Sequence, residues 1–232
     1  MPKEILAKTI LNKTQRRDPW FLDEYTSNAW SGCPMNCLYC YIRGSKYGEN
    51  MAEGLSVKTN AVDLFEKELG RRAAKGQHGI IVLSSATDPY PHFEETQKTT
   101  RRFLEIILEN RFPLHVITKS DLVLRDLDLL KEIGRMAIFP KDLEGVLKHR
   151  VFISFSFSTF DQEISKIFEP GAPEPARRLR AMKTLGESGL LTGASLMPLL
   201  PFISDTPEAL EKAVNELHSH GARYAFPATL TL

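Results

Sequence analysis

Short apolar runs alternate with amphipathic segments along most of the chain. The apolar runs fall at 79–83, 114–118, 151–156, 191–197 and 222–231, and residues 29–32 form a shorter candidate before them. Runs of this length are typical of buried strands. Apolar residues at helical spacing predict helices over 60–74, 95–110, 122–133, 174–188 and 207–220. The pattern therefore predicts strands and helices in strict alternation.

This alternation favours parallel strands joined by right-handed crossovers. A barrel-like curved sheet and a doubly wound open sheet both fit it, and both place chemistry in the loops after the strands. Gly134 is expected to end the third helix, and Thr206 with Pro207 to begin the fifth. Residues 135–150 are an extra segment, expected at the end of the sheet opposite the chemistry. The chain stops on its sixth strand, as a fragment or a naturally shortened protein would.

Composition narrows the class of protein. The chain has 232 residues, 42% hydrophobic and 25% charged, which predicts one folded domain over 29–232 behind an N-terminal lead over 1–28. No apolar run reaches the roughly 18–20 residues of a membrane span, and the N-terminus lacks a secretory signal. A net charge of +1 gives no general attraction for nucleic acid. We expect a cytoplasmic protein that does not contact a membrane.

All three cysteines, Cys33, Cys37 and Cys40, lie within eight residues in a CxxxCxxC spacing. Clustered thiols in a reducing compartment more often bind metal than each other. Zinc normally takes four protein ligands, and the nearest downstream histidine is His78, so a zinc site has no signature here. Three buried thiols without a ligand are a second alternative. The third is a 4Fe–4S cluster with three thiolate ligands and one iron left open.

The spacing, with the aromatic Tyr39 before the last cysteine, resembles the signature of radical S-adenosylmethionine enzymes. The resemblance implies that Cys33, Cys37 and Cys40 bind three irons of a 4Fe–4S cluster and that S-adenosylmethionine chelates the fourth. It implies that an electron from the cluster cleaves this cofactor to methionine and a 5′-deoxyadenosyl radical, which abstracts hydrogen from a substrate. It also implies an α/β fold, a partial (β/α)6 barrel of parallel strands, with the last helix expected to be lacking here.

Further segments resemble the spore photoproduct lyase-related branch of this superfamily. They follow one another in the expected order over nearly the whole chain, and together they are more specific than any one alone. These segments are Asp18-Pro19-Trp20, Cys40-Tyr41, Ser85-Ala86-Thr87-Asp88-Pro89-Tyr90, Ile117-Thr118-Lys119-Ser120, Glu169-Pro170-Gly171-Ala172-Pro173 and Met197-Pro198-Leu199-Leu200-Pro201-Phe202-Ile203-Ser204-Asp205.

The resemblance implies cofactor-binding roles for residues at the ends of the predicted strands. Ser85, Thr87 and Asp88 follow the second strand, where the superfamily contacts the methionine amino group. The same residues also suit a turn closed by Asp88 and the proline after it.

Three further residues complete the predicted cofactor site. Lys119 follows the third strand, where the lyase places a lysine against the methionine carboxylate, and an ammonium suits that contact. Ser156 ends the fourth strand, where the lyase uses a serine near the ribose. Tyr39 is expected near the adenine.

One departure from the lyase affects the prediction of the reaction. The lyase uses an additional cysteine as hydrogen donor to the substrate radical, whereas this chain has no fourth cysteine. The expected function is therefore a radical S-adenosylmethionine enzyme whose substrate is not identified, and nucleic acid is one candidate. An electron donor such as flavodoxin or ferredoxin is the expected partner. The alternative is a non-catalytic iron–sulfur or zinc-binding scaffold protein. Arg177, Arg178 and Arg180 are interpreted as a solvated helix face.

Overall fold

A seven-stranded sheet forms the centre of the molecule. The computed structural model describes residues 2–43, 54–83 and 86–230. The strands, in their order across the sheet, are β10 (Ala225–Thr229), β9 (Leu191–Leu199), β8 (Val151–Ser156), β7 (Leu114–Thr118), β6 (Ile81–Leu83), β3 (Tyr25–Ser27) and β2 (Leu11–Lys13). Neighbouring strands from β10 to β3 are parallel, and β2 pairs antiparallel with β3 at one edge.

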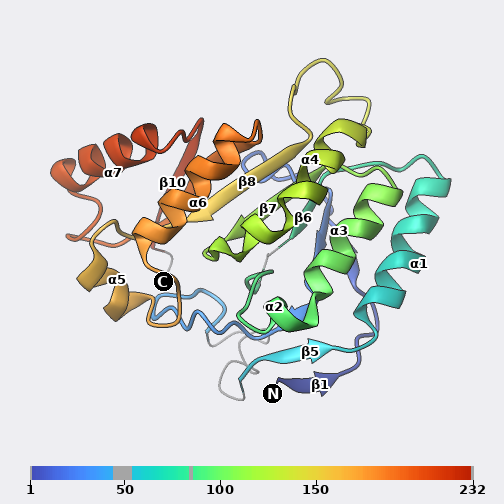
Figure 1. The fold of residues 1–232 in the computed structure, drawn as a ribbon, viewed down its shortest axis with the longest axis horizontal. Helices are drawn as coiled ribbons and strands as arrows, with labels where there is room; N and C mark the ends of the chain where they lie inside the picture. Colours follow the sequence, from blue (N-terminus) through green and yellow to red (C-terminus); the bar gives the residue numbers. More distant parts are fainter. Residues whose placement is uncertain (1, 44–53, 84–85, 231–232) are drawn as a thin grey trace.

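The order of the parallel strands decides between the two topologies. From β3 to β10 the strands follow the chain without reversal, whereas a doubly wound sheet reverses its order. The crossovers therefore all run in one direction, and the helices lie along one side of the sheet (Figure 1). These helices are α1 (Ala61–Ala74), α3 (Thr99–Glu109), α4 (Leu127–Met136), α6 (Pro175–Glu187) and α7 (Pro207–Ser219). The structure is a partial barrel, as expected.

Alternate side chains of each strand point to opposite faces of the sheet. Val116, Ile153 and Ala194 point outward into the main core, which the helices cover, and all three are fully buried. Phe65 of α1 stacks on Phe103 of α3 in this core, with ring centroids 4.2 Å apart. The crossover helices therefore cover one face of the sheet, and the opposite face of the sheet lines the barrel interior.

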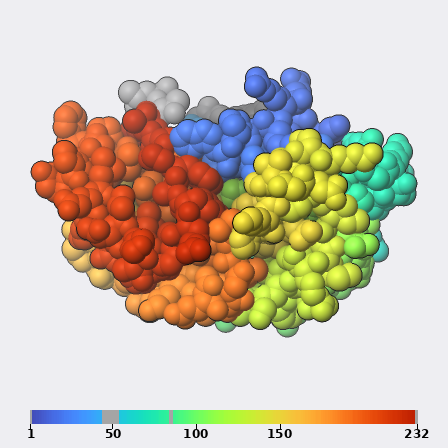
Figure 2. Space-filling model, turned by 90° about the horizontal axis from the view of Figure 1, so that it is seen from above, coloured from blue at the N-terminus to red at the C-terminus, as the bar shows by residue number. Residues whose placement is uncertain are grey.

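The segment between α4 and β8 closes the barrel at the end where the strands begin. Phe139, Leu143 and Leu147 pack there against Ile80, just before β6, and Phe152, near the start of β8. Figure 2 views this end of the molecule and shows the segment in yellow beside the N-terminal residues in blue. Residues 137–150 thus lie where the strands begin, the end at which the segment was expected, whereas 135 and 136 belong to α4.

The open side of the sheet is covered by the turn that precedes β3. Phe21 lies 5.6 Å from Phe226 of β10 between ring centroids, and Trp20 lies 6.2 Å from the same ring. The turn therefore bridges the first and last parallel strands. No helix within the described ranges is long and apolar enough to cross a membrane.

Several predicted elements need correction. The first barrel strand is β3 rather than 29–32; residues Trp30–Ser31 (β4) join a separate small sheet with β1 (Lys3–Ile5) and β5 (Ser56–Lys58). The predicted helix over 95–110 is divided into α2 (Glu94–Gln97) and α3, because Lys98 has a left-handed backbone with a φ of 54°. The predicted helix over 122–133 begins as a 3₁₀ helix, η2 (Asp121–Asp126), and continues as α4 through Gly134 to Met136.

The remaining helices show how local capping sets their bounds. Helix α5 (Gln162–Phe168) was not predicted, although the Asp161 carboxylate accepts hydrogen bonds from the first-turn amides of Glu163 and Ile164. The predicted start of α7 is confirmed, because the Thr206 hydroxyl accepts a hydrogen bond from the Ala209 amide and Pro207 occupies the first turn.

Candidate cofactor and cluster site

A cavity of about 530 Å³ opens where the parallel strands end. Its walls come from the cysteine loop, from the loop after β6, and from the last residues of β7, β8, β9 and β10. Eight of the predicted site residues line it, namely Cys33, Cys37, Cys40, Tyr39, Thr87, Asp88, Lys119 and Ser156. The ninth, Ser85, lies outside the described residues. The topology thus brings together residues that are up to 123 positions apart in the sequence (33 to 156), while their individual roles stay predictions.

The cysteine loop leaves β4 and is held by hydrogen bonds to its own backbone and to the loop after β6. Gly32, with a φ of 79°, turns the chain into the loop. The Thr87 hydroxyl donates to the Gly32 carbonyl oxygen, and Arg43 Nε donates to the Cys37 carbonyl oxygen at 2.9 Å. The small sheet of β1, β5 and β4 supports the point where the loop begins.

The three cysteines face the cavity from this one loop. Burial raises the pKa of the Cys33 thiol to about 12 and also raises the pKa of the Cys37 thiol. Within the described part of the chain no group of three or more His, Cys, Asp or Glu side chains is arranged to hold a metal ion. Three sulfur donors on one loop, facing a cavity, nevertheless fit the donor set of an iron–sulfur cluster, and thiols lose their protons when they bind metal. The residues present therefore fit the group that the sequence predicts.

Asp88 fixes the loop after β6 to the end of β7. Its buried carboxylate accepts hydrogen bonds from the Thr118 hydroxyl and the Lys119 amide, each at 2.7 Å, and from the Tyr90 amide at 2.9 Å. This arrangement gives Asp88 the turn-closing role considered for it, in addition to its place in the cavity wall. It also fixes the backbone from which the Lys119 side chain extends.

The Lys119 side chain runs along the cavity wall. Its Nζ atom donates to the Ser156 hydroxyl at 2.7 Å and lies 3.0 Å from Oε1 of Glu169. Lys119 is 7% exposed and Glu169 is 1% exposed, so this ion pair is buried. Burial alone would raise the pKa of the Glu169 carboxyl, but Lys119 and Arg178 outweigh it and lower that pKa far below its ordinary value.

Glu169 and Arg178 are the site residues that the sequence reasoning missed. Arg178 is fully buried and ion-paired with Glu169, so its interpretation as part of a solvated helix face was wrong. Arg177 does lie on the surface, where it pairs with Asp121 at 2.8 Å. The Glu169-Pro170-Gly171 segment was noted only as part of a resemblance, and a carboxylate preceding a predicted helix gave no separate signal for a buried role.

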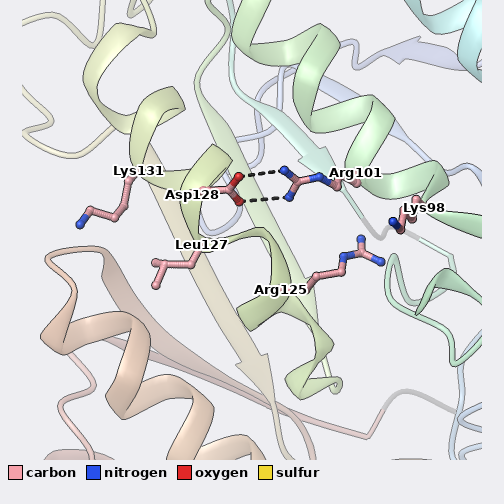
Figure 3. A pocket seen from close by; sticks show the side chains of 6 residues that line it. All are labelled: Lys98, Arg101, Arg125, Leu127, Asp128 and Lys131. Atoms are coloured by element: carbon pink, nitrogen blue, oxygen red, sulfur yellow. Dashed lines mark hydrogen bonds and ion pairs between the residues drawn. The ribbon is translucent and has the colours of Figure 1, made fainter. Parts of the chain in front are cut away.

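A second depression, of about 660 Å³, lies on the outside of the molecule between α3 and α4. It is lined by Lys98, Arg101, Arg125, Leu127, Asp128 and Lys131 (Figure 3). Arg101 forms a two-pronged ion pair with Asp128, and the Arg125 guanidinium is bound by buried carboxylates. None of the predicted site residues lines this depression, so the cavity at the strand ends is the candidate site.

A cysteine loop beside the strand ends of a partial parallel barrel fits the class of protein that the cysteine spacing predicted. A comparison with known families identifies the same class. The family model described as the radical SAM superfamily matches residues 27–217. The chain belongs to this superfamily. It is 32% identical over 206 residues to an uncharacterised protein of Methanocaldococcus jannaschii, a match that covers 87% of this chain and 69% of that protein.

Solved structures share the fold at low sequence identity. A spore photoproduct lyase variant superposes with a TM-score of 0.70 at 17% identity, covering 94% of this chain and 56% of the lyase. SuiB of Streptococcus suis, in a structure bound to S-adenosylmethionine, superposes with a TM-score of 0.60 at 12% identity, covering 89% of this chain and 40% of that one. The chain therefore spans little more than half the length of the lyase.

Proposed function

We propose that the protein is a radical S-adenosylmethionine enzyme that binds a 4Fe–4S cluster through Cys33, Cys37 and Cys40 and reductively cleaves the cofactor. The observation that carries the proposal is the convergence of these three thiols with Lys119 and Ser156 on one cavity at the strand ends. Superfamily membership supports it, as does the S-adenosylmethionine bound to SuiB, whose fold is similar. When bound, the cluster and cofactor together supply a 5′-deoxyadenosyl radical.

The chain's own residues would bind and orient the cofactor. The Lys119 ammonium provides a positive charge for the methionine carboxylate, and Ser156 provides a hydroxyl near the ribose. Thr87 and the backbone of the loop after β6 border the expected position of the amino group. Tyr39 borders the same cavity and supplies an aromatic wall.

The substrate would enter the same cavity, whose lining also includes Asp18, Asp23, Thr26, Met197 and Ala228. We propose a substrate other than the thymine photoproduct, because the chain has no fourth cysteine to serve as the lyase's hydrogen donor. A flavodoxin- or ferredoxin-like electron donor and a cytoplasmic, reducing location complete the proposal.

The alternative is a scaffold protein that binds a metal but cleaves no cofactor. Anaerobic reconstitution with iron and sulfide, followed by dithionite and S-adenosylmethionine, separates the two functions. We expect about four irons and four sulfides per chain, as a 4Fe–4S cluster requires, and formation of 5′-deoxyadenosine. One tightly held zinc without sulfide, or an intact cluster that forms no nucleoside, would establish the scaffold instead.

A further inference from the structure

Buried Glu169 lies at the junction between the cysteine loop and the cofactor-binding end of the sheet. One carboxylate oxygen, Oε1, accepts hydrogen bonds from the Tyr39 phenol and from the Ser158 hydroxyl at 2.9 Å, and pairs with Lys119. The other oxygen, Oε2, pairs with Arg178. A single carboxylate therefore connects the cysteine loop, the end of β7, the end of β8 and helix α6.

The backbone around Glu169 is also docked on the cysteine loop. The Leu38 amide donates to the Phe168 carbonyl oxygen at 2.9 Å, and the Gly171 amide donates to the Met35 carbonyl oxygen at 3.0 Å. A Cβ atom at Gly171 would lie 2.0 Å from the Pro34 carbonyl oxygen, so only glycine permits this approach. The position of the cysteine loop is thus tied to the segment that carries Glu169.

The two cations of this cluster are used differently. Lys119 and Arg178 both pair with the Glu169 carboxylate, and the buried Asp88 carboxylate also lies beside the lysine, whose amide it accepts. Arg178 is used internally: Nε donates to the Pro173 carbonyl oxygen and Nη1 to that of Ser156, both at 2.8 Å, and Nη2 donates to Glu169. Lys119, by contrast, borders the cavity.

The lysine retains binding capacity in this arrangement. An ammonium has three N–H donors. Among the described residues, Glu169 and Ser156 accept two of them, and the Tyr39 ring centroid lies 5.8 Å from Nζ. A spare N–H donor of a buried ammonium beside a cavity favours an anionic ligand group, because a charge-assisted hydrogen bond stabilises both partners. Glu169 and Ser156 fix two directions of the ammonium, and the third is left for that group.

We propose that Glu169 is a positioning residue that aims Lys119 at the carboxylate end of S-adenosylmethionine and fixes that lysine relative to the cysteine loop through Tyr39. This inference rests on the function proposed above. It predicts that Glu169 affects only the part of cofactor affinity that depends on the ligand carboxylate.

The test compares two ligands on anaerobically reconstituted protein with an oxidised cluster, so that no cleavage occurs. S-adenosylmethionine carries the carboxylate, whereas 5′-methylthioadenosine has the same adenosine portion without it. Calorimetric titration of Glu169→Gln should show affinity for S-adenosylmethionine reduced at least tenfold, with affinity for 5′-methylthioadenosine unchanged within about twofold. Glu174→Gln is the matched control, because Glu174 is exposed and bonds only Gln162 among its described side-chain partners; it should bind both ligands like the parent protein.

A double-mutant cycle with Lys119→Met shows whether Glu169 acts through the lysine. The double variant should bind S-adenosylmethionine no more weakly than the weaker single variant, because both changes remove one interaction. Independent effects that multiply, or equal losses for both ligands, would overturn the proposal in favour of a purely structural role. If Glu169→Gln does not fold, Glu169→Asp is measured instead. It keeps the charge on a shorter side chain and should lose about threefold to tenfold for S-adenosylmethionine alone.

The parent protein separates the failure of this inference from that of the proposed function. Parent protein that assembles a cluster and binds S-adenosylmethionine, while Glu169→Gln binds it equally well, would overturn the role of Glu169 only. Parent protein that binds neither iron nor S-adenosylmethionine would overturn both.

Discussion

The inward face of strand β8 begins among apolar side chains and ends among polar ones. At its start, Phe152 packs against Ile80 and Leu143 in the segment that closes the barrel. Four residues later, the Ser156 hydroxyl accepts a hydrogen bond from Lys119 and borders the cavity. One strand thus supplies apolar contacts that stabilise the fold at one end and polar contacts suited to a ligand at the other.

Between these two regions, hydrogen bonds join Phe21, His115, Ser154 and Tyr224. These residues belong to the closed end of the barrel, where the segment between α4 and β8 packs. His115 Nδ1 donates to the Phe21 carbonyl oxygen at 3.0 Å, because a carbonyl oxygen can only accept. Nε2 therefore accepts from the Ser154 hydroxyl at 2.7 Å, and Ser154 accepts in turn from the Tyr224 phenol at 3.1 Å. These groups at the closed end bond one another, whereas at the cavity end Lys119 keeps a donor beside the cavity.

The largest effect that separates the two regions is expected from the cysteines. Cys33→Ser, Cys37→Ser and Cys40→Ser should each lower iron content and abolish 5′-deoxyadenosine formation, because serine is a harder and poorer ligand for this soft site. Circular dichroism should show that the fold is kept, since the core is built on the apolar strands. Cofactor cleavage at the parent rate by any one of the three variants would contradict the three-thiolate site.

The sequence predicted the framework of both regions because each strand and helix carries its own periodic signal. The apolar runs at 114–118 and 151–156 match β7 and β8 residue for residue. The cysteine spacing located the loop, and the strand ends located Lys119 and Ser156. Such features are local in sequence, and parallel topology alone brings strand ends together.

What the sequence did not reveal depends on contacts between distant segments. The burial of Arg178 depends on Glu169 and on the Ser156 carbonyl oxygen, which helical periodicity does not encode. The division of the helix at Lys98 lets the amides of Thr100 and Arg101 donate to the buried Glu94 carboxylate, which also pairs with the distant Arg125. Residues 29–32 were a reasonable strand, but their partner is β5 rather than the barrel.

At the closed end, Phe152→Ala should cause the next largest effect, on stability alone. Removing this ring from the cluster with Ile80 and Leu143 should reduce the free energy of unfolding by about 3–5 kcal/mol. Chemical denaturation measures the loss. Phe202→Ala is the matched control, because Phe202 is 93% exposed and its removal should change stability little. Equal losses for both variants would show that the closing segment contributes no core.

His115 should make the closed end sensitive to pH. Burial lowers its pKa from 6.5 to about 4, so between these values the unfolded chain binds a proton that the folded chain does not. The free energy of unfolding should therefore decrease as pH falls below 6.5, by about 1.4 kcal/mol per unit and about 3 kcal/mol in all. Denaturation of His115→Gln at pH 7, 6 and 5 should show a slope reduced by about one proton, whereas the exposed His149→Gln should keep the parent slope. Identical slopes for all three proteins would mean that His115 titrates normally.

The smallest effects are expected from two serines on one face of β8. Ser156→Ala removes an acceptor for the Lys119 ammonium and should weaken S-adenosylmethionine binding by about 1 kcal/mol, or roughly fivefold, with little loss of stability. Ser154→Ala, two residues earlier, leaves His115 and Tyr224 without their shared partner and should lower stability while cofactor affinity stays the same. Titration calorimetry and denaturation of both variants measure the two effects together. If Ser154→Ala weakened cofactor binding as much as Ser156→Ala, the boundary between the closed end and the cavity end would lie nearer the start of the strand than these contacts place it.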